Sequence, residues 1–180
     1  MIPRLETERL ILREFRPEDF EAFAAIMGDP EVARYLPGGE AMARIDAWRF
    51  MAACIGHWTM RGYGTWVVER KSDGAVMGRI GLMNPETWPG LEVGWTLGRL
   101  YWGRGYATEA AKATLRYAFL TQPVDEIIST IHPDNKASQS VAVKLGETKG
   151  PRIDIVLAGY VYTCDVWSIS RAAWQRTLAA

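Results

Sequence analysis

The most constraining feature of the sequence is the stretch Leu97-Gly-Arg-Leu-Tyr-Trp-Gly-Arg-Gly-Tyr-Ala-Thr-Glu-Ala110, where an apolar segment passes through a glycine-rich bend into a helix-forming sequence. Gly103 and Gly105 leave the backbone open, so that several amide groups can converge on one anion. The first turn of a helix carries unpaired N–H groups and a partial positive charge, and Arg104 adds a full charge. The bend therefore indicates a phosphate site, with a plain turn as the alternative.

Hydrophobic periodicity predicts alternating strands and helices in one mixed α/β domain over residues 1–180. The expected strands cover 9–15, 65–69, 76–83, 91–97, 125–131, 153–157 and 160–169. The expected helices start at Pro17, cover 31–36, 40–60 and 135–145, follow the glycine-rich bend, and end the chain around Trp174. The fourth and fifth strands should be parallel, because a helix connects them.

Three motifs occur in order: the bend from Trp102 to Ala110, then Asn135-Lys-Ala-Ser138, then Lys144-Leu-Gly146. Together they resemble the GCN5-related N-acetyltransferases (GNAT), most closely the branch that contains ribosomal-protein N-terminal (alanine and serine) acetyltransferases. The resemblance extends from Glu8 to Ser170. One departure is Leu100, where the family often has Gln or Arg.

This resemblance implies a single-domain GNAT-like fold, in which a central mixed, mostly antiparallel sheet is flanked by helices. The sheet would be splayed between its fourth and fifth strands, with acetyl-CoA in the gap. Gly94 suggests either a bulge in the fourth strand, as in the family, or the close approach of another backbone. The cofactor contacts that the resemblance implies are Trp95, Leu97, Trp102, Gly103, Arg104, Gly105, Tyr106, Ala107, Thr108, Asn135 and Ser138.

Two residues are candidates for the chemistry of acetyl transfer. Glu92, on the strand that enters the bend, is the candidate base, because related enzymes often place a carboxylate there; a solvated strand carboxylate is the alternative. Ser138 is the candidate acid toward the leaving thiolate, with a helix-capping hydroxyl as the alternative. Many members of the family have Tyr at the position of Ala142.

The acceptor is expected to be a protein N-terminal α-amine or a small amine. Deprotonating an α-amine at pH 7 costs roughly 1 kcal/mol, against about 4.6 kcal/mol for a Lys side chain. Trp88, in the loop 84–90, is either an acceptor contact or a cap over the core. A non-catalytic acyl-CoA sensor stays open as a second function. A dinucleotide-binding oxidoreductase and a serine hydrolase would need motifs that this sequence lacks.

Charge and composition bear on partners and location. With 21 basic and 21 acidic residues, nothing recommends nucleic acid or a membrane as a partner, and we expect a cytoplasmic protein, with a homodimer possible. Cys54 and Cys164 are far apart, and His57 and His132 are the only histidines. We therefore expect no metal site and no disulfide framework.

Overall fold

The structure is a computed structural model and describes residues 2–157 and 159–179. Its strands are β1 (Leu5–Glu6), β2 (Leu10–Arg13), β3 (Thr65–Arg70), β4 (Val76–Met83), β5 (Glu92–Leu97), β6 (Glu126–Ile131), β7 (Thr148–Leu157) and β8 (Tyr160–Ser170). Its helices are α1 (Phe20–Met27), α2 (Pro30–Ala33), α3 (Arg44–Arg61), α4 (Tyr106–Thr121), α5 (Lys136–Leu145) and α6 (Arg171–Ala179). Two short 3-10 helices, η1 (Pro17–Asp19) and η2 (Arg99–Tyr101), precede α1 and α4.

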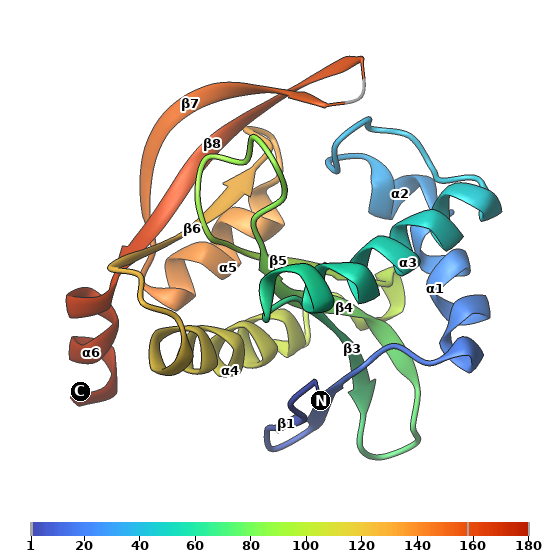
Figure 1. The fold of residues 1–180 in the computed structure, drawn as a ribbon, viewed down its shortest axis with the longest axis horizontal. Coiled ribbons are helices and arrows are strands. Elements are labelled where there is room, and N and C mark those ends of the chain that lie inside the picture. The colour runs from blue at the N-terminus through green and yellow to red at the C-terminus, as the bar shows by residue number, and fades with distance from the viewer. Residues whose placement is uncertain (1, 158, 180) are drawn as a thin grey trace.

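The strands form a single eight-stranded sheet in the order β1-β2-β3-β4-β5-β6-β8-β7 (Figure 1). The expected mixed, mostly antiparallel sheet is confirmed, because only β5 and β6 pair in parallel. The short β1 was missed by the sequence analysis. β7 begins five residues earlier than expected and shifts register against β8 between Lys149 and Arg152. Pro151 lies within that shift and lacks the N–H that a regular ladder needs.

The expected separation of the fourth and fifth strands, β5 and β6, is also present. The two strands share one register pair, Glu92 with Ile128. Beyond it, side chains replace the backbone ladder: the Thr130 N–H faces a Glu92 carboxylate oxygen at 3.4 Å, and the Ser129 hydroxyl lies 2.9 Å from the Val93 carbonyl. In a regular parallel ladder this amide and this carbonyl would have bonded to each other. The sheet therefore opens at residues whose polar groups remain satisfied.

The bulge expected at Gly94 is not present. β5 pairs with β4 in unbroken register from Glu92 to Leu97, and Gly94 lies directly opposite Gly81. A Cβ at Gly81 would come within 2.4 Å of the Gly64 carbonyl oxygen. The close approach of another backbone thus occurs at Gly81, whereas the atoms nearest to a Cβ at Gly94 would be side-chain atoms of Glu92 and Arg79.

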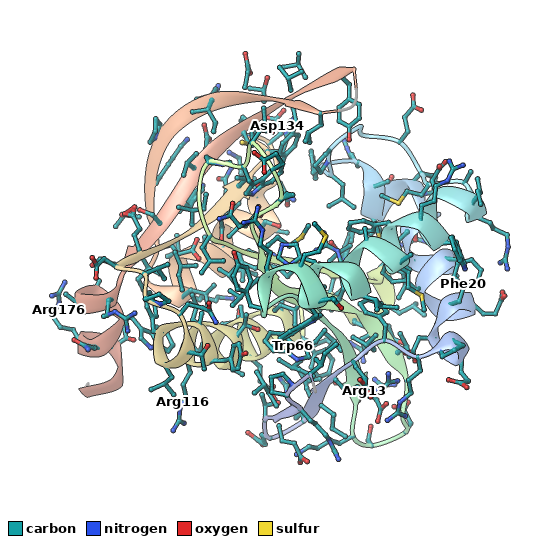
Figure 2. The ribbon with its side chains drawn as sticks, in the orientation of Figure 1. Arg13, Phe20, Trp66, Arg116, Asp134 and Arg176 are labelled. Carbon is teal, nitrogen blue, oxygen red and sulfur yellow. The ribbon has the colours of Figure 1, made fainter. Side chains whose placement is uncertain are left out.

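Helices cover both faces of the sheet, because alternate strand residues point to opposite sides. Val67 packs with α1 and α3, whereas Trp66 and Val68 belong to the larger cluster that includes Ala110 and Leu115 of α4. Figure 2 shows Trp66 inside the molecule, and Arg116 and Arg176 projecting outward from α4 and α6. The small residues of α4 let this helix lie close to the sheet.

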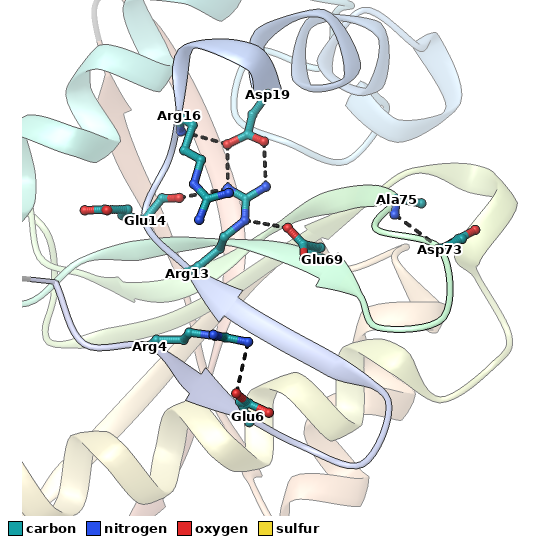
Figure 3. Close-up of polar contacts among 9 residues, drawn as sticks. All are labelled: Arg4, Glu6, Arg13, Glu14, Arg16, Asp19, Glu69, Asp73 and Ala75. Carbon is teal, nitrogen blue, oxygen red and sulfur yellow. Dashed lines mark hydrogen bonds and ion pairs between the residues drawn. The ribbon is translucent and has the colours of Figure 1, made fainter.

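A buried ion-pair network fixes the start of α1 to the sheet (Figure 3). Two Arg13 nitrogens donate to the two Asp19 carboxylate oxygens, each at 2.7 Å, and a third donates to Glu69 at 2.6 Å. Asp19 also accepts from the Arg16 N–H at 2.7 Å. Because Asp19 accepts its hydrogen bonds, the pKa of Arg13 is raised above its ordinary value.

Two further observations bear on membranes and metals. Among the helices in the described ranges, none combines the length and apolar character that a membrane span requires. The same ranges contain no cluster of three or more His, Cys, Asp or Glu residues placed to hold a metal ion. Cys54 and Cys164 are both buried free thiols.

Candidate active site

The glycine-rich bend connects β5 to α4 through η2. Gly103 and Gly105 have φ angles of 72° and 80°, in the left-handed region that favours glycine. A Cβ at Gly103 would meet no heavy atom within 4 Å. Glycine is therefore favoured there by the left-handed backbone conformation and not by lack of space. Gly105 is the N-cap of α4, and the first N–H groups of a helix have no partners inside it. The bend thus presents free amides beside a helix N-terminus.

Arg9 holds this bend against the first strands. Its guanidinium donates to Glu109 at 2.6 Å and to the Arg104 carbonyl at 3.0 Å, and it lies 4.4 Å from the centroid of the Tyr106 ring. Glu109 also accepts from the Thr7 hydroxyl at 2.6 Å. The sequence analysis gave no role to Arg9, because its partners are about a hundred positions away along the chain.

A cavity of about 750 Å³ opens where β5 and β6 separate. All but one of the predicted site residues lie on its wall: Glu92, Trp95, Leu97, Trp102, Gly103, Gly105, Tyr106, Ala107, Thr108, Asn135 and Ser138. The exception is Arg104, which is exposed and does not line the cavity. The Trp102 indole donates to the Leu97 carbonyl at 2.7 Å and so links the two ends of the bend.

Ser138 lies in the first turn of α5 and lines the same cavity. The Asn135 side chain caps this helix by accepting from the Ser138 N–H at 3.1 Å. Ser138 is therefore not the capping hydroxyl, and its Oγ instead accepts from the Trp95 indole at 3.3 Å. In the part of the chain that the structure describes, no acceptor is found for the Ser138 hydroxyl proton.

Glu92 is buried on the wall and is not the solvated strand carboxylate of the alternative interpretation. One carboxylate oxygen accepts from the Trp88 indole through a short hydrogen bond, and the other accepts from the Thr130 hydroxyl at 3.1 Å. Burial raises the pKa of Glu92, and these hydrogen bonds oppose the rise. A carboxylate with a raised pKa is a stronger base than an exposed one.

Glu147 is a second buried carboxyl group behind this wall, and the sequence analysis missed it. Its Oε1 lies 3.0 Å from the Ser129 hydroxyl, which also lies 2.9 Å from the Val93 carbonyl. Burial, with the charge of Glu92 adding to it, raises the pKa of Glu147 to about 8. At pH 7 Glu147 is therefore protonated and donates to Ser129, which leaves the single Ser129 proton for the Val93 carbonyl.

Arg79, in the middle of β4, was also missed. It is buried, lines the cavity, and stacks over the Phe50 ring at 4.9 Å. One of its terminal nitrogens contacts the Met83 sulfur at 3.3 Å, while its Nε has no partner. Burial lowers the pKa of Arg79. A charged residue within the otherwise apolar segment 76–83 was the sequence signal that could have drawn attention to it.

Aromatic side chains line the end of the cavity away from the bend. Tyr35 lies 5.2 Å from His132, measured between ring centroids, and Tyr162 comes from β8. Trp88 also lines the cavity, and it packs against the cluster around Ile155. Trp88 therefore packs against a core cluster and also faces the cavity, where a contact with the acceptor stays a prediction.

A comparison with known families decides what kind of protein this is. Residues 9–148 match the model of the acetyltransferase (GNAT) domain. The chain belongs to the GNAT family. The expected resemblance is thus confirmed, and the matched region contains the splayed strands, the glycine-rich bend and the start of α5.

Individual relatives agree with this assignment. The uncharacterized N-acetyltransferase YoaA of Bacillus subtilis is 30% identical over 164 residues, which cover 90% of each chain. The crystal structure of an acetyltransferase from Agrobacterium tumefaciens superimposes with a TM-score of 0.82 at 29% identity, covering 95% of this chain and 96% of the other. The family and these relatives make this GNAT protein an N-acetyltransferase rather than a sensor.

The ribosomal branch appears among the structural neighbours. The ribosomal-protein-S5-alanine acetyltransferase of Vibrio fischeri has a TM-score of 0.75 at 20% identity, and the alignment covers 96% of this chain and 98% of that one. At this identity the likeness concerns the fold. The acceptor of this GNAT protein has to be argued from its own cavity.

Proposed function

We propose that this N-acetyltransferase moves the acetyl group of acetyl-CoA to a primary amine, an α-amine of a small molecule or of a protein N-terminus. The observation that carries the proposal is the placement of a buried carboxylate, Glu92, on the same cavity wall as the glycine-rich bend. Such a wall pairs a proton acceptor with an anion site, which acetyl transfer from a CoA thioester to an amine requires.

The residues present fit acetyl-CoA. The amides around Gly103 and Gly105, next to the N-terminus of α4, suit a pyrophosphate group. The gap between β5 and β6 suits an extended arm, and Asn135 and Ser138 line the same cavity. When bound, acetyl-CoA supplies a thioester carbonyl that an amine attacks and a thiolate that leaves.

Glu92 would accept the proton that the amine loses as it attacks. Its raised pKa brings the group closer to neutral pH, where a general base works best. The α-amine of a peptide or protein N-terminus needs less help than a Lys side chain, because its ordinary pKa lies within about one unit of pH 7. One buried carboxylate is therefore adequate for an α-amine.

Ser138 would hydrogen-bond to the leaving thiolate. The Trp95 indole already donates to its oxygen, so the hydroxyl proton is free to point elsewhere. Ala142, at the position where many members of the family have Tyr, is buried and has no hydroxyl, and Ser138 lies one turn earlier on α5 and lines the cavity. Its proton would stabilise the thiolate as the C–S bond breaks.

The test is an acceptor screen that follows thiol release from acetyl-CoA, repeated with Glu92→Gln and with Glu126→Gln as the control. Glu126 is an exposed carboxylate on β6. We expect Glu92→Gln to lower kcat by about 10²-fold, to leave the Kd for acetyl-CoA near wild type, and to recover partly at high pH. Wild-type kcat in Glu92→Gln would exclude Glu92 as the base.

Ser138→Ala extends the same test to the acid. We expect it to lower the single-turnover rate by about 10²-fold or somewhat less, since thiolate is a good leaving group and water can replace the hydroxyl. The Kd for acetyl-CoA should stay close to wild type. A normal single-turnover rate would assign Ser138 a packing role instead.

A further inference from the structure

Arg79 and Thr96 form a polar pair on the cavity wall that the chemistry above does not use. They lie directly opposite each other on β4 and β5. Their side chains are 8% and 5% exposed, and both line the cavity. The Arg79 Nε and the Thr96 Oγ1 are buried atoms without a hydrogen-bond partner. Two adjacent unsatisfied donors are costly inside a protein unless a ligand meets them.

The charge of Arg79 is not neutralised by an ion pair within residues 2–157 and 159–179. Glu92 is the carboxylate whose charge acts on Arg79, but the Glu92 oxygens accept hydrogen bonds from Trp88 and Thr130 instead. Stacking over Phe50 and contact with the Met83 sulfur stabilise a cation only weakly. A planar guanidinium with free donors is suited to a carboxylate.

Gly94 lies between this pair and Glu92 on β5. A Cβ at Gly94 would be 3.3 Å from a Glu92 carboxylate oxygen and 4.0 Å from a terminal nitrogen of Arg79. The bare backbone therefore leaves open the space that separates a proton acceptor from a buried cation. A molecule occupying this space would place an amine beside Glu92 and an anionic group beside Arg79.

We infer that the acceptor is a small primary amine that carries a carboxylate next to its amine, as an α-amino acid does, and that Arg79 and Thr96 bind this carboxylate. The inference rests on the proposed function, because it needs the amine at Glu92. The aromatic and thioether groups at this end of the cavity, such as Phe50 and Met83, suit an apolar side chain on the acceptor.

The test compares three acceptors with one side chain: L-methionine, L-methioninamide and the peptide Met-Ala-Ala-amide. Only the first has a carboxylate beside its amine, and because this carboxylate also raises the pKa of the amine, kcat/KM is compared per neutral amine. We expect wild-type kcat/KM to be roughly 10- to 100-fold higher for methionine than for either amide, as a charge-assisted hydrogen bond would give. In Arg79→Gln the ratio should fall close to one, and in Arg79→Lys it should be partly retained.

The variants are compared by the ratio of kcat/KM for methionine to kcat/KM for the amides, because any effect of Arg79 on Glu92 changes all three acceptors alike. Thr96→Val, which keeps the shape of the side chain, should lower the ratio by about 5-fold through the lost hydrogen bond. Arg116→Gln is the matched control: it removes an exposed charge on α4 and should leave the ratio unchanged. Arg116 projects away from the body of the molecule in Figure 2.

The outcomes separate the inference from the proposed function. Equal or better acetylation of the two amides by the wild type, or a ratio that survives Arg79→Gln, would overturn the carboxylate site and leave amine acetylation standing. Absence of acetylated product from all three acceptors and from the wider amine screen would overturn the proposed function itself. A lowered ratio in Arg116→Gln would attribute the preference to long-range charge instead of contact.

Discussion

Two buried arginines of this GNAT protein have opposite surroundings. Arg13 on β2 is 7% exposed and donates to two carboxylates, whereas Arg79 on β4 is 8% exposed and forms no ion pair in the part of the chain that the structure describes. The pKa of Arg13 is raised by its hydrogen bonds to Asp19, and the pKa of Arg79 is lowered by burial. Equal burial thus has opposite electrostatic consequences.

The difference separates a structural charge from one that awaits a ligand. The carboxylates around Arg13 come from η1 and β3, so the network joins a helix start to the sheet. Around the cavity, Arg79 and Glu147 are buried without a partner of opposite charge among the described residues. Such groups lower stability, and proteins commonly tolerate that loss where a site needs it.

The first prediction concerns Arg13, the arginine that forms ion pairs. Arg13→Met should lower the free energy of unfolding by about 3–5 kcal/mol, because it leaves the buried carboxylate of Asp19 without its cation. Urea denaturation followed by circular dichroism would measure the loss, with Arg116→Met as the surface control. The double variant Arg13→Met/Asp19→Asn should recover part of it. A single variant as stable as wild type would show that the network is not structural.

The sequence predicted those features of the fold that depend on local backbone conformation. Glycines at Gly103 and Gly105 predicted the bend, because left-handed φ angles favour glycine whatever the distant surroundings. The helices expected over 40–60 and 135–145 end at Gly62 and Gly146, which adopt the same left-handed conformation. The strand order around the splay followed from the family resemblance; the site residues that it implied line the cavity apart from Arg104, and their roles stay predictions.

The failures concern residues whose role depends on distant partners. Nothing near Arg79 in the sequence distinguishes an unpaired arginine from Arg13, since the difference lies in what the fold brings within reach. Glu147 reads as an ordinary polar residue after a helix, yet β6 buries it against Ser129. Of the two explanations offered for Gly94, the bulge was wrong, because β5 stays in register with β4 throughout, and the atoms nearest to a Cβ at this position belong to the side chains of Glu92 and Arg79.

The second prediction concerns the unpaired carboxyl group. Glu147 has a folded pKa of about 8 and an ordinary value of 4.5. Between these values the unfolded chain has lost the proton that the folded protein keeps. The ionisation of Glu147 therefore leaves the free energy of unfolding unchanged below pH 4.5. Between pH 4.5 and about 8 it lowers the free energy of unfolding as the pH rises, and above about pH 8 the loss is complete.

Glu147→Gln should remove this dependence, because Gln cannot ionise and still donates to Ser129. Relative to wild type, we expect the variant to gain about 3–5 kcal/mol in the free energy of unfolding at pH 9, as a pKa raised from 4.5 to about 8 implies, and less than about 1 kcal/mol at pH 5. Urea denaturation at pH 5, 7 and 9 would measure it, with the exposed Glu126→Gln as the control. Parallel stability curves for wild type and Glu147→Gln would contradict the protonated state assigned to Glu147.

The smallest effect, and the sharpest contrast with Arg13, is expected for Arg79→Met without ligands. Removing an unpaired buried cation relieves its desolvation, while Met keeps apolar contact with Phe50 and Met83. Losing the attraction between Arg79 and Glu92 offsets part of this gain. The free energy of unfolding should therefore stay within about 1 kcal/mol of wild type, on the stabilising side.

The same urea titration checks this, since Arg13→Met and Arg79→Met make one chemical change at two equally buried sites. Addition of N-acetyl-L-methionine together with CoA should then raise the stability of the wild type more than that of Arg79→Met, because only the wild type binds the carboxylate. A loss of stability in Arg79→Met comparable to that in Arg13→Met would make Arg79 a structural residue. The two arginines would then differ only in the partners that stabilise them, and Arg79 would not serve to bind the carboxylate of an acceptor.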